Sequence, residues 1–144
     1  MSKFSFKMDG LDELNKDLEK LANAFVSDEV EKSSLDAAEI IRAEAERNAP
    51  KGPTGNLKRS LIKKLLKRRA GQPAPAIAAV DRKIAPHAHW IEFGTGPRYQ
   101  KKTGKYVGSV PARPFFRPAL MTKGKSVANR LHGDLKKMVD KAVK

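Results

Sequence analysis

The sequence lacks cysteine altogether, has few aromatic residues and contains no long apolar run. Without cysteine, the chain can form no disulfide and can offer no thiolate as a nucleophile or metal ligand. No stretch approaches the ~20 apolar residues that cross a bilayer. The charged start of the sequence, MSKFSFKMDG, lacks the apolar segment of a signal peptide. We therefore expect no membrane partner and a protein that folds in a reducing cytoplasm.

Acidic residues are scarce in the later part of the chain. Residues 1–50 hold 7 Lys/Arg and 12 Asp/Glu, a net charge of −5, whereas residues 51–144 hold 23 Lys/Arg and 4 Asp/Glu, a net charge of +19. An asymmetry of this kind indicates a polyanion near the second part, acidic protein partners, or head-to-tail packing between copies. The simpler alternative is a solvated basic face that only keeps the protein soluble.

The length and the apolar periodicity predict one domain over residues 1–144, with basic loops around 67–75 and 97–105. Apolar residues at alternating steps of three and four predict a helix over 11–25, with Asp9 as its cap. A second helix is predicted from Ser27 to about Asn48, and a C-terminal helix over about 118–142. For the stripe over 11–25, core packing is favoured over a short coiled coil.

The middle of the chain is ambiguous. Leu57, Leu61 and Leu65 have helical spacing, so residues 57–69 could form a helix. Short strands are predicted over Ala76–Val80 and Tyr106–Val110. We therefore expect an α+β fold in which N-terminal helices and a long C-terminal helix pack on a small, mainly antiparallel β-sheet.

The stretch from Pro86 to Leu120 holds the only Trp, both Tyr and three of the six Phe. Its first part, HAHWIEF, predicts a short helix that ends at Gly94, because glycine readily adopts the left-handed conformation of a helix end. Trp90 and Phe93 lie three residues apart and would share a face, so we expect both to anchor against a core.

The second part of the stretch, PARPFFRPAL, is held extended by its prolines. Phe115 and Phe116 are adjacent, so in an extended chain they point to opposite sides. One of them would enter the core and the other would meet a partner; the alternative is that both are buried locally. Glu92 is the only acid between Asp81 and Asp134. We expect it to form a bidentate ion pair with Arg113 or Arg117, and such a pair at a subunit boundary would set the register of assembly.

No pattern in the sequence predicts an enzyme. There is no phosphate-binding GK[ST] loop, and Gly94-Thr95-Gly96 lacks the rest of a dinucleotide fingerprint. His87 and His89 would point to different faces of a helix, so they make a poor metal pair. We predict no catalytic residues, no cofactor and no metal.

Three motifs in order resemble the tail-component family of long-tailed bacteriophages: Ala45–Pro50 with Thr54-Gly55-Asn56-Leu57, the box Trp90–Thr95, and the box Pro111–Leu120. The resemblance implies a structural virion protein of the neck, which completes the tail and joins it to the head. It also implies a homo-oligomeric ring, six-fold in our expectation, contacts with other neck and tail proteins, and a strand within residues 57–69. The protein would be located in the virion, after a period in the host cytoplasm.

The resemblance and the charge pattern together nominate two groups of residues. The first group would define the fold or the contact between subunits: Trp90, Glu92, Phe93, Gly94, Thr95, Arg113, Pro114, Phe115, Phe116, Arg117 and Pro118. The second group would face DNA or acidic partners: Lys58, Arg59, Lys63, Lys64, Lys67, Arg68, Arg69, Lys101, Lys102 and Lys105. A sequence-independent nucleic-acid-binding protein is the main alternative, and a tail-terminator or head-closure ring is a variant within the phage class. A small hydrolase is disfavoured because no nucleophile lies near a base.

Overall fold

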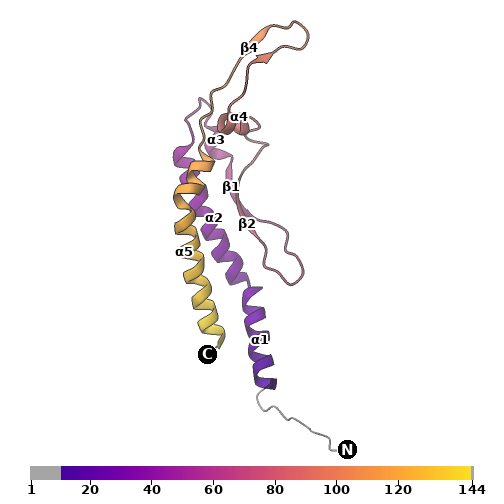
Figure 1. The fold of residues 1–144 in the computed structure, drawn as a ribbon, viewed down its shortest axis with the longest axis vertical. Helices are drawn as coiled ribbons and strands as arrows, with labels where there is room; N and C mark the ends of the chain where they lie inside the picture. The colour runs from indigo at the N-terminus through magenta and orange to yellow at the C-terminus, as the bar shows by residue number, and fades with distance from the viewer. Residues whose placement is uncertain (1–10, 144) are drawn as a thin grey trace, which may run out of the picture.

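A computed structural model describes residues 11–143 of the chain, with the side chains of residues 12–143. The molecule is elongated, and two long helices run along it side by side (Figure 1). Helix α2 (Asp28–Asn48) runs toward one end, and α5 (Phe116–Val143) returns antiparallel to it. Helix α1 (Leu11–Phe25) extends beyond the start of α2 and contacts α5 near its end. The predicted cap Asp9 lies outside the described residues.

The helices begin and end where the sequence indicates. Ser27 is the N-cap residue of α2 and has an extended backbone, although its hydroxyl donates to the Ala24 carbonyl oxygen at 2.6 Å instead of capping the helix. Helix α2 ends just before Pro50, which cannot continue a helical hydrogen-bond ladder. The C-terminal helix is slightly longer than predicted, because it begins at Phe116 and Pro118 occupies its first turn.

Residues 56–65 form one helical turn followed by a strand. The turn is α3 (Asn56–Arg59) and the strand is β1 (Leu61–Leu65), so the strand implied by the family resemblance is confirmed and a helix over 57–69 is wrong. Strand β1 pairs antiparallel with β2 (Ala76–Val80), with Leu61 opposite Val80. One hairpin therefore covers the side of α2 that faces away from α5.

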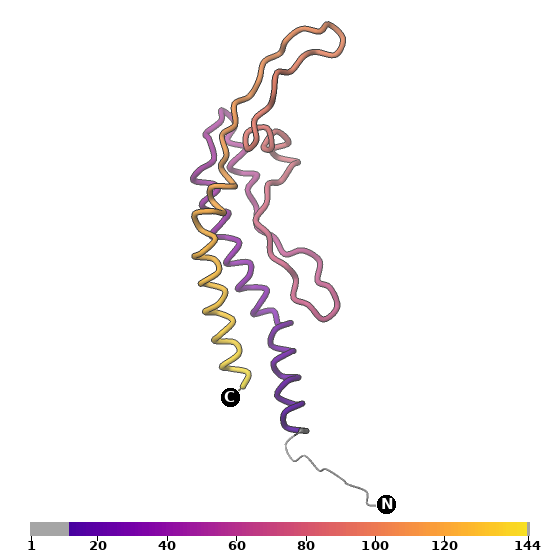
Figure 2. Tube along the Cα trace, in the orientation of Figure 1, coloured from indigo at the N-terminus to yellow at the C-terminus, as the bar shows by residue number. Residues whose placement is uncertain are grey.

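A second two-stranded ladder projects from the opposite end of the molecule to α1 (Figure 2). It is formed by β3 (Arg98–Tyr99) and β4 (Tyr106–Gly108), which are also antiparallel. The predicted α+β class is confirmed, but the small sheet consists of two separate ladders. Strand β3 was not predicted, and β4 is shorter than the predicted strand over 106–110.

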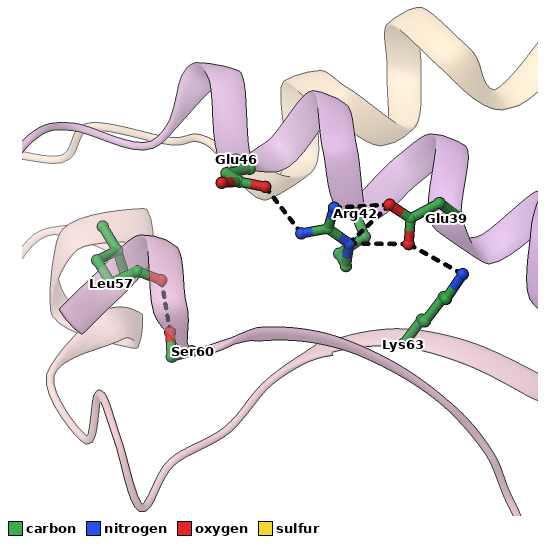
Figure 3. A network of polar contacts seen from close by, with 6 residues as sticks. All are labelled: Glu39, Arg42, Glu46, Leu57, Ser60 and Lys63. Atoms are coloured by element: carbon green, nitrogen blue, oxygen red, sulfur yellow. Dashed lines mark hydrogen bonds and ion pairs between the residues drawn. The ribbon is translucent and has the colours of Figure 1, made fainter. Parts of the chain in front are cut away.

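Two groups of ion pairs fasten the first hairpin to α2. Arg42 contacts Glu39 at 2.6 Å and Glu46 at 2.8 Å, and Lys63 of β1 reaches Glu39 at 3.3 Å (Figure 3). The hydrogen bonds from Arg42 lower the pKa of Glu39 to about 2 and outweigh the opposing effect of burial. Farther along the hairpin, Glu31 accepts hydrogen bonds from Arg68 Nε at 2.6 Å and from the backbone N–H of Ala74 at 2.7 Å.

The hydrophobic core is small and sits where α2, α3, β1, α4 and the start of α5 meet. Its buried members are mostly alanines, and Phe115, 1% exposed, is the largest fully buried side chain among the described residues. The core does not extend to α1. Leu14, Leu18 and Phe25 are 54%, 53% and 44% exposed, so the predicted core packing of this stripe is wrong. The reason is that α1 lies beyond the first hairpin, so no other element of the described residues covers one side of the helix.

Candidate functional site

The two boxes of the central stretch bind each other within one chain. The first box forms α4 (Ala88–Phe93), and the second box leads into α5. Glu92 Oε2 accepts hydrogen bonds from the backbone N–H groups of Phe115 at 2.8 Å and Phe116 at 3.0 Å, and Oε1 accepts one from Arg117 at 2.9 Å. A single carboxylate thus satisfies three free donors at the start of α5, where the helix dipole also favours negative charge.

Glu92 is buried, 8% exposed, and is ionised at neutral pH. Burial raises the pKa of its carboxyl, but the three backbone donors and the charge of Arg117 outweigh burial, so the pKa lies below its ordinary value. The predicted ion pair with Arg113 or Arg117 does not form within one chain. In the described part of the chain, no Lys or Arg nitrogen lies within ion-pair distance of Glu92. The carboxylate lies at the start of α5, where backbone N–H groups are closer than any guanidinium.

Gly94 and Thr95 hold the second box against the first on the other side of α4. Gly94 has a φ of +73°, and an added Cβ would lie 2.9 Å from the Ala112 nitrogen and 3.0 Å from the Val110 oxygen, so this position requires glycine. The Thr95 N–H donates to the Val110 carbonyl at 2.8 Å, and the Val110 N–H donates to Thr95 Oγ1 at 3.0 Å. These contacts align the two segments like a short strand pair.

Further contacts complete this arrangement, which we call the clamp (residues 91–95 with 110–117). The Arg113 N–H donates to the Ile91 carbonyl at 2.7 Å. Asn48 at the end of α2 donates to the Phe115 carbonyl at 3.4 Å. Phe115 fills the core and Phe116 is half-buried against it. The clamp therefore fixes α4, α2 and the start of α5 relative to each other.

Two aromatic residues of the first box are not anchors of the core. Trp90 is 42% exposed and Phe93 is 75% exposed, so the prediction that both pack inward is wrong. Helix α4 instead buries Ala88 and Glu92 and packs the partly buried Ile91 against the core, while Trp90 and Phe93 lie on its outer side. The Arg98 guanidinium lies over the Trp90 ring, 5.4 Å from its centroid, and the His89 ring lies 5.2 Å away at an interplanar angle of 60°.

The nominated basic residues divide into two groups. Lys63 and Arg68 are used inside the chain, where they bind acids of α2: Lys63 contacts Glu39, and Arg68 contacts Asp28 at 2.8 Å and Glu31 at 2.6 Å. The remaining basic residues form no ion pair with any described residue: Lys58, Arg59, Lys64, Lys67, Arg69, Lys101, Lys102 and Lys105. All of these except the half-buried Lys58 are exposed.

The β3–β4 hairpin places aromatic rings among these cations. Tyr99 and Tyr106 face each other across the ladder with ring centroids 5.6 Å apart, and they are 63% and 53% exposed. Lys101, Lys102 and Lys105 lie in the loop between them. The pairing of the two tyrosines was not predicted from the sequence, because β3 is only two residues long. A tyrosine on either side of a Gly/Lys turn was the pattern that could have indicated it.

Residues 11–143 contain no group of three or more His, Cys, Asp and Glu side chains that could hold a metal ion. None of the helices described here has both the length and the apolarity needed to cross a membrane. The fold and the clamp define an elongated α+β protein whose two boxes bind each other and fix the start of α5.

The chain belongs to the HK97-gp10-like family, because the family model described as "Bacteriophage HK97-gp10, putative tail-component" matches residues 12–94, more than half of its length. The resemblance suggested by the motifs is thereby confirmed at the level of a bacteriophage tail component, a structural class of protein whose place is in the virion. The match covers the first box of the clamp up to Gly94, and the second box lies outside it. The curated proteins and the solved structures yielded no match.

Proposed function

We propose that this protein is a structural subunit of the phage head–tail joint that completes the tail and assembles as a ring around the DNA path. The observation that carries this proposal is the excess of exposed surface. The chain exposes 11233 Å², whereas a compact monomer of 15.9 kDa is expected to expose about 7,400 Å². A subunit that buries surface against neighbours has this property.

The excess is too large to come from the ends of the chain alone. Residues 1–10 and 144 would add at most about 1,800 Å² even if they were fully extended. About 2,000 Å² of excess therefore belongs to the described part of the molecule. This area is comparable to the total that stable protein interfaces bury. Exposed large apolar residues occur at both ends of the molecule, on α1 and on the β3–β4 hairpin, as a subunit with several neighbours requires.

The clamp supports a mechanical role for such a subunit. It uses its one buried acid to hold backbone groups, and it leaves no carboxylate free for acid–base chemistry at this place. The unpaired lysines and arginines of the two hairpins would face DNA or acidic neighbouring proteins. Contacts with DNA through these cations would be independent of base sequence and would weaken with salt, because each rests on phosphate neutralisation.

Light scattering and negative-stain imaging test the proposal. The purified protein, alone or mixed with tail tubes that lack it, is expected to form rings or caps at one end of the tubes. A protein that stays monomeric and binds neither tubes nor heads would overturn the proposal. Imaging of complete particles would then separate a tail-completion position from a tail-terminator or head-closure position.

A sequence-independent nucleic-acid-binding function is favoured by one specific observation, the Tyr99–Tyr106 pair set among Lys101, Lys102 and Lys105. Exposed aromatic rings beside cations are suited to stacking on unpaired bases. If this is the main function, the chain binds single-stranded oligonucleotides more tightly than duplexes, and Tyr106→Ala removes that preference. Equal and weak binding of single-stranded and duplex oligonucleotides, with an affinity that depends on the salt concentration alone, would favour the structural role.

A further inference from the structure

An amphipathic helix and an apolar groove lie at different places on the same chain, and among the described residues nothing covers the exposed stripe of the helix or the groove. The stripe of α1 exposes Leu14, Leu18 and Phe25 to about half of their full extent. A groove of about 590 Å³ lies between α4 and the start of α5. Phe93 and Leu120 line it and are 75% and 54% exposed. Large apolar side chains gathered in this way indicate surfaces that are covered in the assembled state.

We propose that α1 of one copy docks its apolar stripe into the α4–α5 groove of a second copy. This inference rests on the proposed function, because it names the surfaces through which neighbouring subunits of the ring would touch. The binding mode is that of an amphipathic helix laid in a hydrophobic groove, with anchors at helical spacing. Leu14, Leu18 and Phe25 have this spacing along one face.

The charges of the two surfaces are complementary. Helix α1 carries four acids and two lysines, and one of those lysines, Lys20, is already paired with Asp17 at 2.8 Å. The groove is bordered by Arg82 and Arg117. Its acid, Glu92, is occupied by three backbone donors and has little remaining capacity to repel a second acidic surface. Two copies of α1 would instead bring like net charges together, which disfavours a symmetric contact between these helices.

The contact must form between copies and not within one. Helix α1 extends beyond the start of α2, whereas α4 and the start of α5, which line the groove, lie near the end of α2 (Figure 1). The 21 residues of α2 separate the two surfaces by about 30 Å at the rise of an α-helix. A contact between two different surfaces is head-to-tail, and head-to-tail contacts generate rings when the rotation between neighbours closes.

The absence of cysteine in the chain allows a crosslinking test without background. Two single-cysteine variants, Leu18→Cys and Phe93→Cys, are mixed and oxidised, and the products are separated on a non-reducing gel. We expect a disulfide-linked dimer only in the mixture. The matched control replaces Phe93→Cys by Leu66→Cys, an exposed apolar position on the first hairpin. A dimer yield in the test mixture that does not exceed the control by at least about tenfold would overturn the proposal.

Other occupants of the surfaces are separate outcomes of the same experiment. Strong crosslinking of Leu18→Cys to itself would show that α1 helices pair with each other, and a dimer with Tyr106→Cys would place α1 on the β3–β4 hairpin; either result overturns the proposal. The double variant Leu14→Ala/Leu18→Ala supplies a second readout. It changes only exposed side chains, so its circular dichroism should match that of the wild type while its oligomer is lost.

Different results would overturn the docking of α1 and the proposed function. Rings or tube caps that persist in Leu14→Ala/Leu18→Ala, without the Leu18–Phe93 crosslink, would overturn the docking of α1 and leave the ring intact. The absence of the Leu18–Phe93 crosslink, together with a wild type that forms no rings with or without tail tubes, would overturn both.

Discussion

Replacing Glu92 with alanine tests the clamp directly. The substitution removes the acceptor of three hydrogen bonds of 2.8, 2.9 and 3.0 Å at the start of α5. The Phe115 N–H is buried and would stay unsatisfied, at a cost of about 1–3 kcal/mol. The other two donors are partly accessible to water, and losing a cap for them costs about 1 kcal/mol. We expect the free energy of unfolding to fall by about 3 kcal/mol.

This loss is large relative to the ~5–15 kcal/mol stability of ordinary domains. Urea unfolding followed by circular dichroism at low protein concentration measures it, and hydrogen exchange locates it. The amides of Phe115, Phe116 and Arg117 should exchange faster. Glu92→Gln keeps one acceptor oxygen and should lose about half as much stability. The matched control is Asp140→Ala, which removes an exposed acid near the other end of α5.

A loss of unfolding free energy below about 1 kcal/mol in Glu92→Ala, or a loss no larger than that of Asp140→Ala, would show that Glu92 does not stabilise the start of α5. Unchanged protection of the three amides in Glu92→Ala would show the same. An ion pair between Glu92 and Arg113 predicts a different pattern, because Arg113→Ala would then cost as much as the change at Glu92. The structure predicts little effect for the Arg113 side chain.

Three further predictions concern the same region. Acid should destabilise the wild type more than Glu92→Gln. Folding lowers the pKa of Glu92, so the stability that its carboxylate contributes is present above the unfolded pKa of about 4.5 and is lost as the pH falls through the folded pKa. Urea unfolding between pH 6 and 3 would show this loss. Gly94→Ala should lose about 2–3 kcal/mol in urea unfolding, because its φ is +73° and the new Cβ would meet the Ala112 nitrogen at 2.9 Å; wild-type stability would contradict this. Phe115→Ala should lower the free energy of unfolding by about 3–5 kcal/mol, because its ring fills the core. The change Phe93→Ala removes an exposed ring, so it should cost less than about 1 kcal/mol and show its effect in assembly. Equal losses in thermal unfolding would contradict the placement of the two rings.

The sequence predicted the elements that depend on local chemistry. Helices α2 and α5 follow from apolar periodicity, and the end of α4 at Gly94 follows from the conformational freedom of glycine. The strand within residues 57–69 did not follow from spacing, since Leu57, Leu61 and Leu65 also fit a helix. It was found through the family resemblance, and the pairing with β2 explains it physically.

The partner of Glu92 could not be predicted from residue types. A carboxylate among arginines suggests an ion pair, but backbone N–H groups occur at almost every residue and leave no mark in the sequence. The correct choice depends on where the axis of α5 lies, which is a tertiary property. The same holds for Lys63 and Arg68, which read as part of a basic surface but neutralise acids of α2 across the first hairpin.

The exposed apolar residues show another limit of prediction from the sequence. The spacing of Leu14, Leu18 and Phe25 predicts a helix with an apolar face, and it carries no information on whether the covering surface belongs to the same chain or to another. Trp90 and Phe93 were misplaced for the same reason. Helix α4 buries Ala88 and Glu92 on its inner face, which places Trp90 and Phe93 on the outer face.

Complementation of a phage that lacks this gene would show whether the protein joins heads to tails. Electron microscopy counts joined particles after the protein is supplied or withheld. We expect filled heads and separate tails without the protein, and joined particles when the wild type is supplied. Normal numbers of joined particles in the absence of the protein would contradict a role at the head–tail joint.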